Sequence, residues 1–222
     1  VAGKWFSGVT TDHFDGKHFY NIGWSKRESY HLEWKNGKLW SFIKWLISRK
    51  RMRWEYRNIT PTVPKDRNST QTFEITFVGH ATILIQVAWL NIITDPVWSK
   101  RTSPLSFFWP KRFTDPGVTF ANLPKIDIVL LSHNHYDHMD ISTLKQLAAR
   151  DNPKIYTWLW NKDYLKKYNI LNVIDMDWWK TEVIEPIKDG IITFVPAQHF
   201  SARGITDRNK TLWGGFITSI WG

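Results

Sequence analysis

The sequence predicts an α/β (α+β) fold, and three observations support this prediction. The chain has 222 residues, of which 42% are hydrophobic and 23% are charged, and this is ordinary usage for a globular protein with a buried core. Short β-type runs follow one another from residue 73, and beyond residue 126 strand and helix patterns alternate. The sequence has no internal repeat and no apolar run long enough to span a bilayer.

Residues 1–71 are predicted to form an N-terminal arm with a basic amphipathic helix and a linker. Residues 1–35 have no clear period, whereas from Leu39 the apolar residues fall on one side of a helix. The basic run 49–53 follows, so this helix is able to lie on an anionic membrane, although packing against its own domain is an equally good interpretation. Residues 58–72 have the proline and polar content of a linker, which places the domain boundary there.

Residues 72–222 are predicted to form the main domain. It begins with three consecutive antiparallel strands at 73–78, 82–87 and 90–94, followed by a long proline-containing loop over 97–123. A buried strand at 126–131 precedes a helix at 141–150, for which Asp140 is the expected N-cap. The remaining expected elements are a helix at 161–168 and strands at 154–157, near 173, at 181–184, at 191–195 and at 212–220.

Composition and charge exclude several kinds of site. The chain has no cysteine, so any metal ion must be bound by histidine, aspartate and glutamate. The formal net charge of +10 favours an anionic partner such as a phosphate, a phospholipid or nucleic acid. The 15 tryptophans suit a membrane interface or a single-stranded nucleic-acid groove, and an aromatic-rich core explains them equally well.

The segment SHNHYDHMD at residues 132–140 is the strongest candidate site, because it follows the buried strand at 126–131 and holds three of the eight histidines. Residues two apart in an extended segment share a face, so His133 and His135 are placed to bind one metal ion. Asp137 and His138, in the following turn, are placed to reach a second ion. His199 is the one histidine downstream that is available as a third imidazole for the first ion. Imidazole and carboxylate ligands suit zinc, and also iron or manganese.

These motifs resemble the metallo-β-lactamase superfamily, whose signature is HxHxDH after a strand, and within it the branch of the N-acylphosphatidylethanolamine-hydrolysing phospholipase D. The segments VGHAT at 78–82, TDPVWS at 94–99 and PKRF at 110–113 carry the resemblance to this branch. The resemblance implies an αββα sandwich with two zinc ions at the edge of its sheets. By position, the two ions would be bound by His133, His135 and His199, and by Asp137 and His138.

The same resemblance implies further roles. Asp137 and His138 are the implied catalytic residues, and His80 and Asp95 would support the ligands or face the substrate. The implied reaction is hydrolysis by a hydroxide that forms because metal coordination lowers the pKa of water to about 7. The family's bridging aspartate and last histidine have no counterpart in this sequence, so the 222 residues are expected to be incomplete at the C-terminus, as part of a longer polypeptide or a truncated product.

The function expected from the resemblance is that of a zinc phosphodiesterase acting on a phospholipid, with peripheral membrane contact. A sugar-phosphate lactonase of the same superfamily is one alternative. The other is a non-catalytic basic module that binds membrane or, less favoured, nucleic acid. A cytoplasmic or peripheral membrane location is favoured, and the sequence leaves the oligomeric state open.

Overall fold

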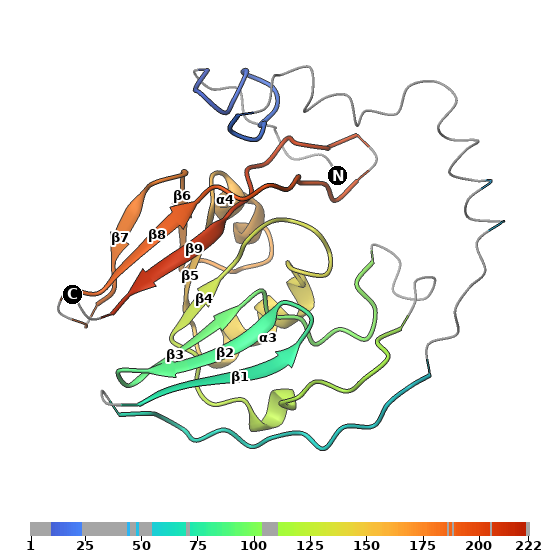
Figure 1. Ribbon diagram of the computed structural model, residues 1–222, viewed down its shortest axis with the longest axis vertical. Coiled ribbons are helices and arrows are strands. Elements are labelled where there is room, and N and C mark those ends of the chain that lie inside the picture. The colour runs from blue at the N-terminus through green and yellow to red at the C-terminus, as the bar shows by residue number, and fades with distance from the viewer. Residues whose placement is uncertain are drawn as a thin grey trace.

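The computed structural model describes residues 10–23, 44, 48, 55–69, 72–103, 111–185, 187, 189–204 and 206–220. Within these ranges a six-stranded sheet and a three-stranded sheet lie one in front of the other, with helices beside the larger sheet (Figure 1). The amphipathic helix predicted from Leu39 falls outside the described residues, apart from Lys44 and Ser48, which are helical.

The six-stranded sheet combines an antiparallel half with a parallel half. The antiparallel half is the predicted run of three consecutive strands, and β3 then pairs in parallel with β4, which pairs with β5, which pairs with β6. In order, the six strands are β1 (Phe73–Gly79), β2 (Thr82–Val87), β3 (Leu90–Thr94), β4 (Ile128–Leu130), β5 (Lys154–Trp158) and β6 (Val173–Met176).

The helices lie between the parallel strands in the chain, as the sequence predicts. Helix α3 (Ile141–Arg150) begins directly after the histidine-rich segment, and the Asp140 side chain caps it by accepting a hydrogen bond from the Ser142 backbone N–H. Helix α4 (Asn161–Lys166) packs against β5 and β6. A short 3₁₀ helix, η1 (Phe120–Asn122), lies in the described part of the predicted loop. None of the helices in the described residues is both long and apolar enough to cross a membrane.

The second sheet consists of β7 (Thr181–Val183), β8 (Ile191–Val195) and β9 (Gly215–Ser219), all antiparallel. Figure 1 shows it in front of the β5–β6 end of the first sheet. Ile192 and Phe194 of β8 belong to the same buried cluster as Tyr156 and Trp158 of β5. Along β1, by contrast, Phe73, Ile75 and Phe77 form a row that is more than half exposed to solvent.

Two predicted strands are shorter in the structure by three or more residues, because residues at their ends form hydrogen bonds with side chains or loops instead. The strand predicted over 126–131 keeps only β4, since the Ile126 N–H donates to Asp151 Oδ2 at 2.8 Å instead of to a neighbouring strand. The strand predicted from Leu212 begins at Gly215, because the Gly214 N–H donates to the Ser132 carbonyl oxygen at 3.0 Å.

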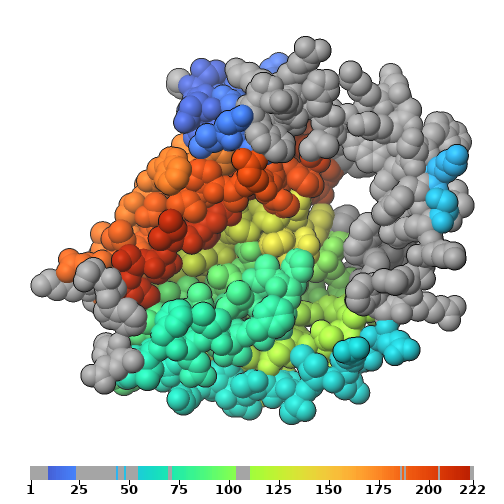
Figure 2. All heavy atoms as spheres, viewed as in Figure 1, coloured from blue at the N-terminus to red at the C-terminus, as the bar shows by residue number. Residues whose placement is uncertain are grey.

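Residues 10–23, which the sequence assigns to an arm, share the core of the main domain. Phe14 and Phe19 are almost completely buried, and their rings lie 6.0 and 5.6 Å from that of Trp160. His13 is hydrogen-bonded to Asp177 at 2.9 Å. In Figure 2 this blue segment rests on elements from the last third of the chain. The segment has no helix or strand, so its irregular backbone matches the prediction while its packing goes beyond it.

Candidate metal centre

The register of the first sheet brings three turns to one edge. Ile83 of β2 pairs with Thr94 of β3, and Thr94 pairs with Leu130 of β4. The β1–β2 hairpin, the end of β3 and the end of β4 therefore lie next to one another. These turns carry His80, Asp95 and the histidine-rich segment 132–140, respectively.

The first candidate ligand group consists of three imidazoles. His133 Nε2 lies 2.9 Å from His135 Nδ1 and 3.0 Å from His199 Nε2. His133 and His135 come from the loop after β4, whereas His199 comes from the loop that follows β8. The extended spacing does place the first two imidazoles together, and tertiary packing brings the third to them.

Asp95 and Ser132 determine which nitrogen of His133 carries its proton. The Ser132 backbone N–H donates to Asp95 Oδ1 at 2.8 Å, and the Ser132 hydroxyl donates to Asp95 Oδ2 at 2.7 Å. The hydroxyl oxygen, 2.8 Å from His133 Nδ1, is then an acceptor for the Nδ1–H. The proton of the neutral ring is therefore on Nδ1, and Nε2 presents a lone pair to His135 and His199.

The three imidazoles are neutral at physiological pH. Burial, reinforced by the neighbouring histidines, lowers the pKa of His133 to about 2 and that of His135 to about 4. Burial also lowers the pKa of His199, and the charge of Arg208 contributes to the shifts of both His135 and His199. Since only an unprotonated nitrogen can bind a metal ion, these shifts favour ligation.

The second candidate group consists of His80, Asp137 and His138, whose ligand atoms lie within 4.8 Å of one another. His80 Nε2 is 3.1 Å from Asp137 Oδ2. His138 Nδ1 lies 2.8 Å from Asp95 Oδ2, so its Nδ1–H donates to that carboxylate and Nε2 is available. Burial alone would lower the pKa of His138, but the hydrogen bond to Asp95 and the charges of Asp95 and Asp137 raise it.

The two groups are adjacent, and the solvent exposure of their side chains rises from His133 toward His80 and His199. The rings of His133 and His138 are 4.0 Å apart, so one residue of each group touches the other group. His133 is buried at 4% exposure, whereas the side chain of His80 is 54% exposed. His199 is also exposed. A substrate therefore has access from the side of His80 and His199.

The donor set fits bound divalent metal ions. Within the described residues, the structure brings together two groups of three ligands, made of five imidazoles and one carboxylate, without a cysteine. His135 Nδ1 and His199 Nε2 both lie within 3.0 Å of His133 Nε2, and the proton of the His133 ring is bound by Ser132, so a cation among the three nitrogens would accept their lone pairs. This donor chemistry suits zinc, iron or manganese.

The structure also shows where each sequence-predicted site residue lies. His133, His135 and His199 are together, as are Asp137 and His138, and Asp95 touches both sets through Ser132 and His138. The resemblance implied that His80 supports the ligands or faces the substrate, whereas its ring lies among the candidate ligands of the second group, with Nε2 3.1 Å from Asp137 Oδ2.

Three residues that support the site escaped the sequence analysis as functional candidates. Ser132 stands beside the motif, and its position next to His133 is the signal that could have identified it. Arg203 donates to the Asn134 and Met139 carbonyl oxygens at 2.8 and 2.9 Å and so closes the loop that presents the histidines. Arg208 adds positive charge near His199. No local pattern marks either arginine.

Arg112, from the PKRF segment, packs against the hairpin that carries His80. Its Nη1 donates to the Val97 carbonyl oxygen at 2.7 Å, and its Nη2 lies 2.8 Å from where a Cβ on Gly79 would stand. Gly79 has a φ of +146°, which a residue with a side chain rarely adopts. A glycine before His80 therefore allows the arginine to pack under the hairpin.

Fold and site together define a domain that brings two groups of histidine and aspartate side chains, able to hold metal ions, to one sheet edge. A sequence profile described as a beta-lactamase superfamily domain matches residues 90–222. The chain therefore belongs to the beta-lactamase superfamily, as the motifs predicted. Its sheets and helices form the metallo-β-lactamase type of α/β fold.

Among curated relatives, the chain is 35% identical over 159 residues to the N-acyl-phosphatidylethanolamine-hydrolyzing phospholipase D 1 of Caenorhabditis elegans. That match covers 68% of this chain and 44% of the relative. The chain is 34% identical over 134 residues to the mitochondrial N-acyl-phosphatidylethanolamine-hydrolyzing phospholipase D of Saccharomyces cerevisiae, covering 60% of this chain and 28% of the relative. The chain thus spans less than half the length of these relatives.

The chain also matches solved structures. The isothiocyanate hydrolase from Delia radicum gut bacteria matches with a TM-score of 0.48 and 17% identity, covering 66% of this chain and 58% of that one. CmlA, a diiron beta-hydroxylase from Streptomyces venezuelae, matches with a TM-score of 0.48 and 20% identity, covering 69% of this chain and 28% of that one.

Proposed function

We propose that this chain carries the metal centre of a hydrolase that cleaves a phosphodiester bond in a phospholipid, with N-acylphosphatidylethanolamine as the model substrate. The observation that carries the proposal is the juxtaposition of two ligand groups, His133, His135 and His199 beside His80, Asp137 and His138. Superfamily membership and the names of the two phospholipase D relatives support the substrate class.

In this proposal the chain's own residues prepare the centre before substrate arrives. Asp95 holds one proton at His138 Nδ1 and, through Ser132, a second at His133 Nδ1. The opposite nitrogens of both rings are thereby left unprotonated, and through them His133 and His138 would hold the ions. Bound divalent ions, zinc in the first instance, would supply a hydroxide at neutral pH and neutralise charge on the substrate oxygen. Asp137 and His138 are the proposed catalytic residues because they would hold the second ion.

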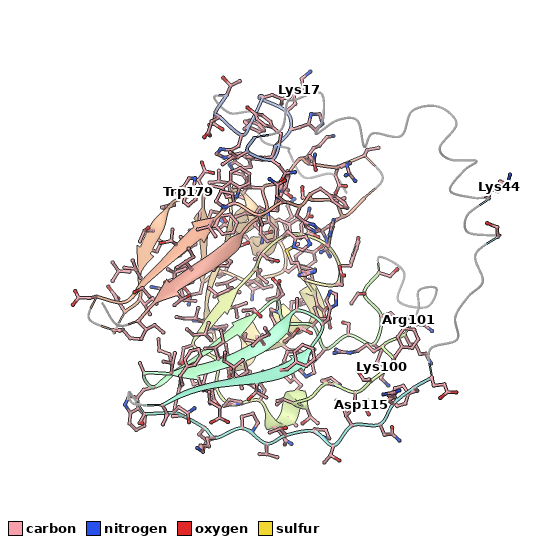
Figure 3. The ribbon with its side chains drawn as sticks, viewed as in Figure 1. Lys17, Lys44, Lys100, Arg101, Asp115 and Trp179 are labelled. Atoms are coloured by element: carbon pink, nitrogen blue, oxygen red, sulfur yellow. The ribbon has the colours of Figure 1, made fainter. Side chains whose placement is uncertain are left out.

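Positive charge supports an anionic substrate and contact with a membrane surface. The chain carries a formal net charge of +10. Lys100 and Arg101 project near one another from the loop that follows β3 (Figure 3). Arg208 lies close enough to influence His135 and His199 electrostatically. Such charges attract a phosphate headgroup and raise its concentration near the centre.

Metal analysis tests the proposal that the chain binds metal ions at these two groups. The purified protein, dialysed against zinc and separately against iron and manganese, is assayed by elemental analysis and by competition with a chromophoric chelator. We expect two bound ions for the unaltered chain and loss of the first ion in His135→Ala, while Asp127→Asn, a substitution at the opposite end of the strands, keeps both. Binding that is unchanged in His135→Ala would overturn the metal assignment.

Product analysis tests the proposal that the substrate is a phospholipid. Mixed vesicles that contain N-acylphosphatidylethanolamine are incubated with the zinc-loaded protein, both as this chain and within its full-length polypeptide. Release of phosphatidic acid that stops in His133→Ala would support the proposal. Turnover of a soluble sugar-phosphate lactone alone would replace the phospholipid substrate by a lactone. Binding of vesicles or nucleic acid without any turnover, and with unchanged affinity in His133→Ala, would favour a binding module.

A further inference from the structure

His199 lies in a loop whose backbone has no strand or helix to hold it. Strand β8 ends at Val195, four positions earlier, and the residues that follow have no regular secondary structure. A histidine in such a loop needs other contacts to keep its ring against His133. The backbone of His199 itself is contacted by a segment 178 positions away in the sequence.

The side chain of Asn21 binds both backbone polar groups of His199. Asn21 Nδ2 donates to the His199 carbonyl oxygen at 3.0 Å, and the His199 N–H donates to Asn21 Oδ1 at 3.2 Å. This pair of hydrogen bonds has the pattern of one step of a β-ladder, with the carboxamide in place of a neighbouring strand. It therefore fixes the position and direction of the His199 backbone.

Asn21 itself is buried, and its amide orientation is determined by its partners. It is 5% exposed, and its Oδ1 also accepts a hydrogen bond from Trp213 Nε1 at 3.2 Å. The same indole N–H donates to the Ala197 carbonyl oxygen at 2.9 Å, so Trp213 ties Asn21 to the start of the His199 loop. Both groups that face Oδ1 are donors and the group that faces Nδ2 is an acceptor, so the carboxamide has one orientation here.

The segment that carries Asn21 is anchored independently of the metal centre. Phe14 and Phe19 are buried in the core, and the Phe19 N–H donates to the Asn209 carbonyl oxygen at 2.7 Å. His13 packs on Trp178, with ring centroids 4.5 Å apart, while it is bonded to Asp177. Because the core fixes this segment, the hydrogen bonds from Asn21 hold the His199 loop in one position.

We propose that Asn21 is a positioning residue for the metal ligand His199, and that residues 10–23 are a structural part of the metal centre. The proposal deepens the proposed function and rests on it, because it takes His199 to be a ligand of the first ion. It also gives the N-terminal segment a role that the profile match at residues 90–222 does not include.

Two substitutions isolate the carboxamide. Asn21→Ala removes all three hydrogen bonds, whereas Asn21→Asp keeps the two acceptor contacts but places an anionic oxygen against the His199 carbonyl oxygen. Loss of an outer support typically weakens metal binding about 10–100-fold, so we expect each variant to bind the first ion at least about ten-fold more weakly. Asn68→Ala is the matched control, because Asn68 is also buried, at 3% exposure, and binds Glu74 instead of the site.

The experiment uses the full chain, with cobalt(II) as a spectroscopic probe and zinc in chelator competition. The visible cobalt spectrum reports the ligand geometry of the first ion, which a loss of stability by itself would not alter, and thermal unfolding of the metal-free proteins measures that stability separately. A weaker affinity and an altered spectrum in both Asn21 variants, with Asn68→Ala unchanged in both, would support the proposal. Unchanged affinity and spectrum in either Asn21 variant would overturn it.

His199→Ala separates the two proposals. If His199→Ala loses the first ion while the Asn21 variants bind normally, the metal function stands and the positioning role fails. If His199→Ala binds as tightly as the unaltered chain, the metal assignment fails, and the positioning role fails with it.

Discussion

Replacing Asp95 by Asn tests the claim that one carboxylate organises both ligand groups. Asp95 accepts three hydrogen bonds, from the Ser132 N–H, the Ser132 hydroxyl and His138 Nδ1–H, at 2.7 to 2.8 Å. Asparagine preserves the size of the side chain but offers a single acceptor oxygen and adds an N–H₂ donor. In either orientation of the amide, its N–H₂ group faces at least one of the N–H or O–H groups that now donate to Asp95. Asp95 has a φ of +35°, and asparagine tolerates this region, so the backbone adds little strain.

The expected losses of stability and of metal affinity in Asp95→Asn follow from these contacts. A hydrogen bond to a charged group contributes about 1.5–3 kcal/mol, and the variant loses at least one of three, so the metal-free protein should lose about 2 kcal/mol of stability. His138 would move its proton to Nε2, and His133 would lose the acceptor chain that keeps its proton on Nδ1. Each effect should weaken metal binding about 10–100-fold, which corresponds to about 1.4–2.8 kcal/mol at each ion.

The assay is zinc titration in competition with a chromophoric chelator, at about pH 8, above the ordinary pKa of histidine. Asp127→Asn is the control, because Asp127 also accepts hydrogen bonds, from Arg67 and the Asn91 N–H, but at the other end of the strands. We expect both ions to bind more weakly in Asp95→Asn and neither to change in Asp127→Asn. Two ions bound by Asp95→Asn with unchanged affinity would refute the reasoning.

Three further predictions test other parts of the structure. His80→Gln keeps a polar side chain beside Asp137 but removes an imidazole, so elemental analysis after dialysis should find one bound ion, and two bound ions would exclude His80 as a ligand. Burial lowers the pKa of His13, but hydrogen bonds to two aspartates outweigh burial and raise it. The stabilisation by His13 is thus complete below its ordinary pKa and is lost as the pH rises through the folded-state value. The melting-temperature advantage over His13→Gln should therefore shrink as the pH is raised above the ordinary pKa of histidine, and a growing advantage would contradict this. Gly214→Ala should lose about 1–3 kcal/mol in denaturant unfolding, because its Cβ would lie 2.5 Å from the Val195 carbonyl oxygen. Gly215→Ala, with 3.8 Å of space, should be nearly neutral, and equal stabilities of the two variants would contradict the clash.

Much of the fold was predictable because its signals are local. Strands β1 to β3 follow from short alternating runs separated by two-residue connections, and α3 follows from its apolar stripe and the Asp140 cap. The ends of elements were less predictable, since β4 is shortened by a hydrogen bond from Ile126 to Asp151, 25 positions away. When a distant side chain takes a hydrogen bond that the neighbouring strand would otherwise form, the sequence of the shortened strand carries no sign of it.

The sequence by itself determined the composition of the candidate centre: its imidazole and carboxylate side chains, the absence of thiolates, and the pairing of His133 with His135, which depends only on the geometry of an extended chain. Only the tertiary structure decided which distant residues join them. Sheet register brings His80 and Asp95 to the edge where the loop after β4 begins, and core packing of the N-terminal segment brings Asn21 to His199. The physical reason is that these contacts close loops of tens to hundreds of residues, and their positions are set by burial and strand pairing that no single segment encodes.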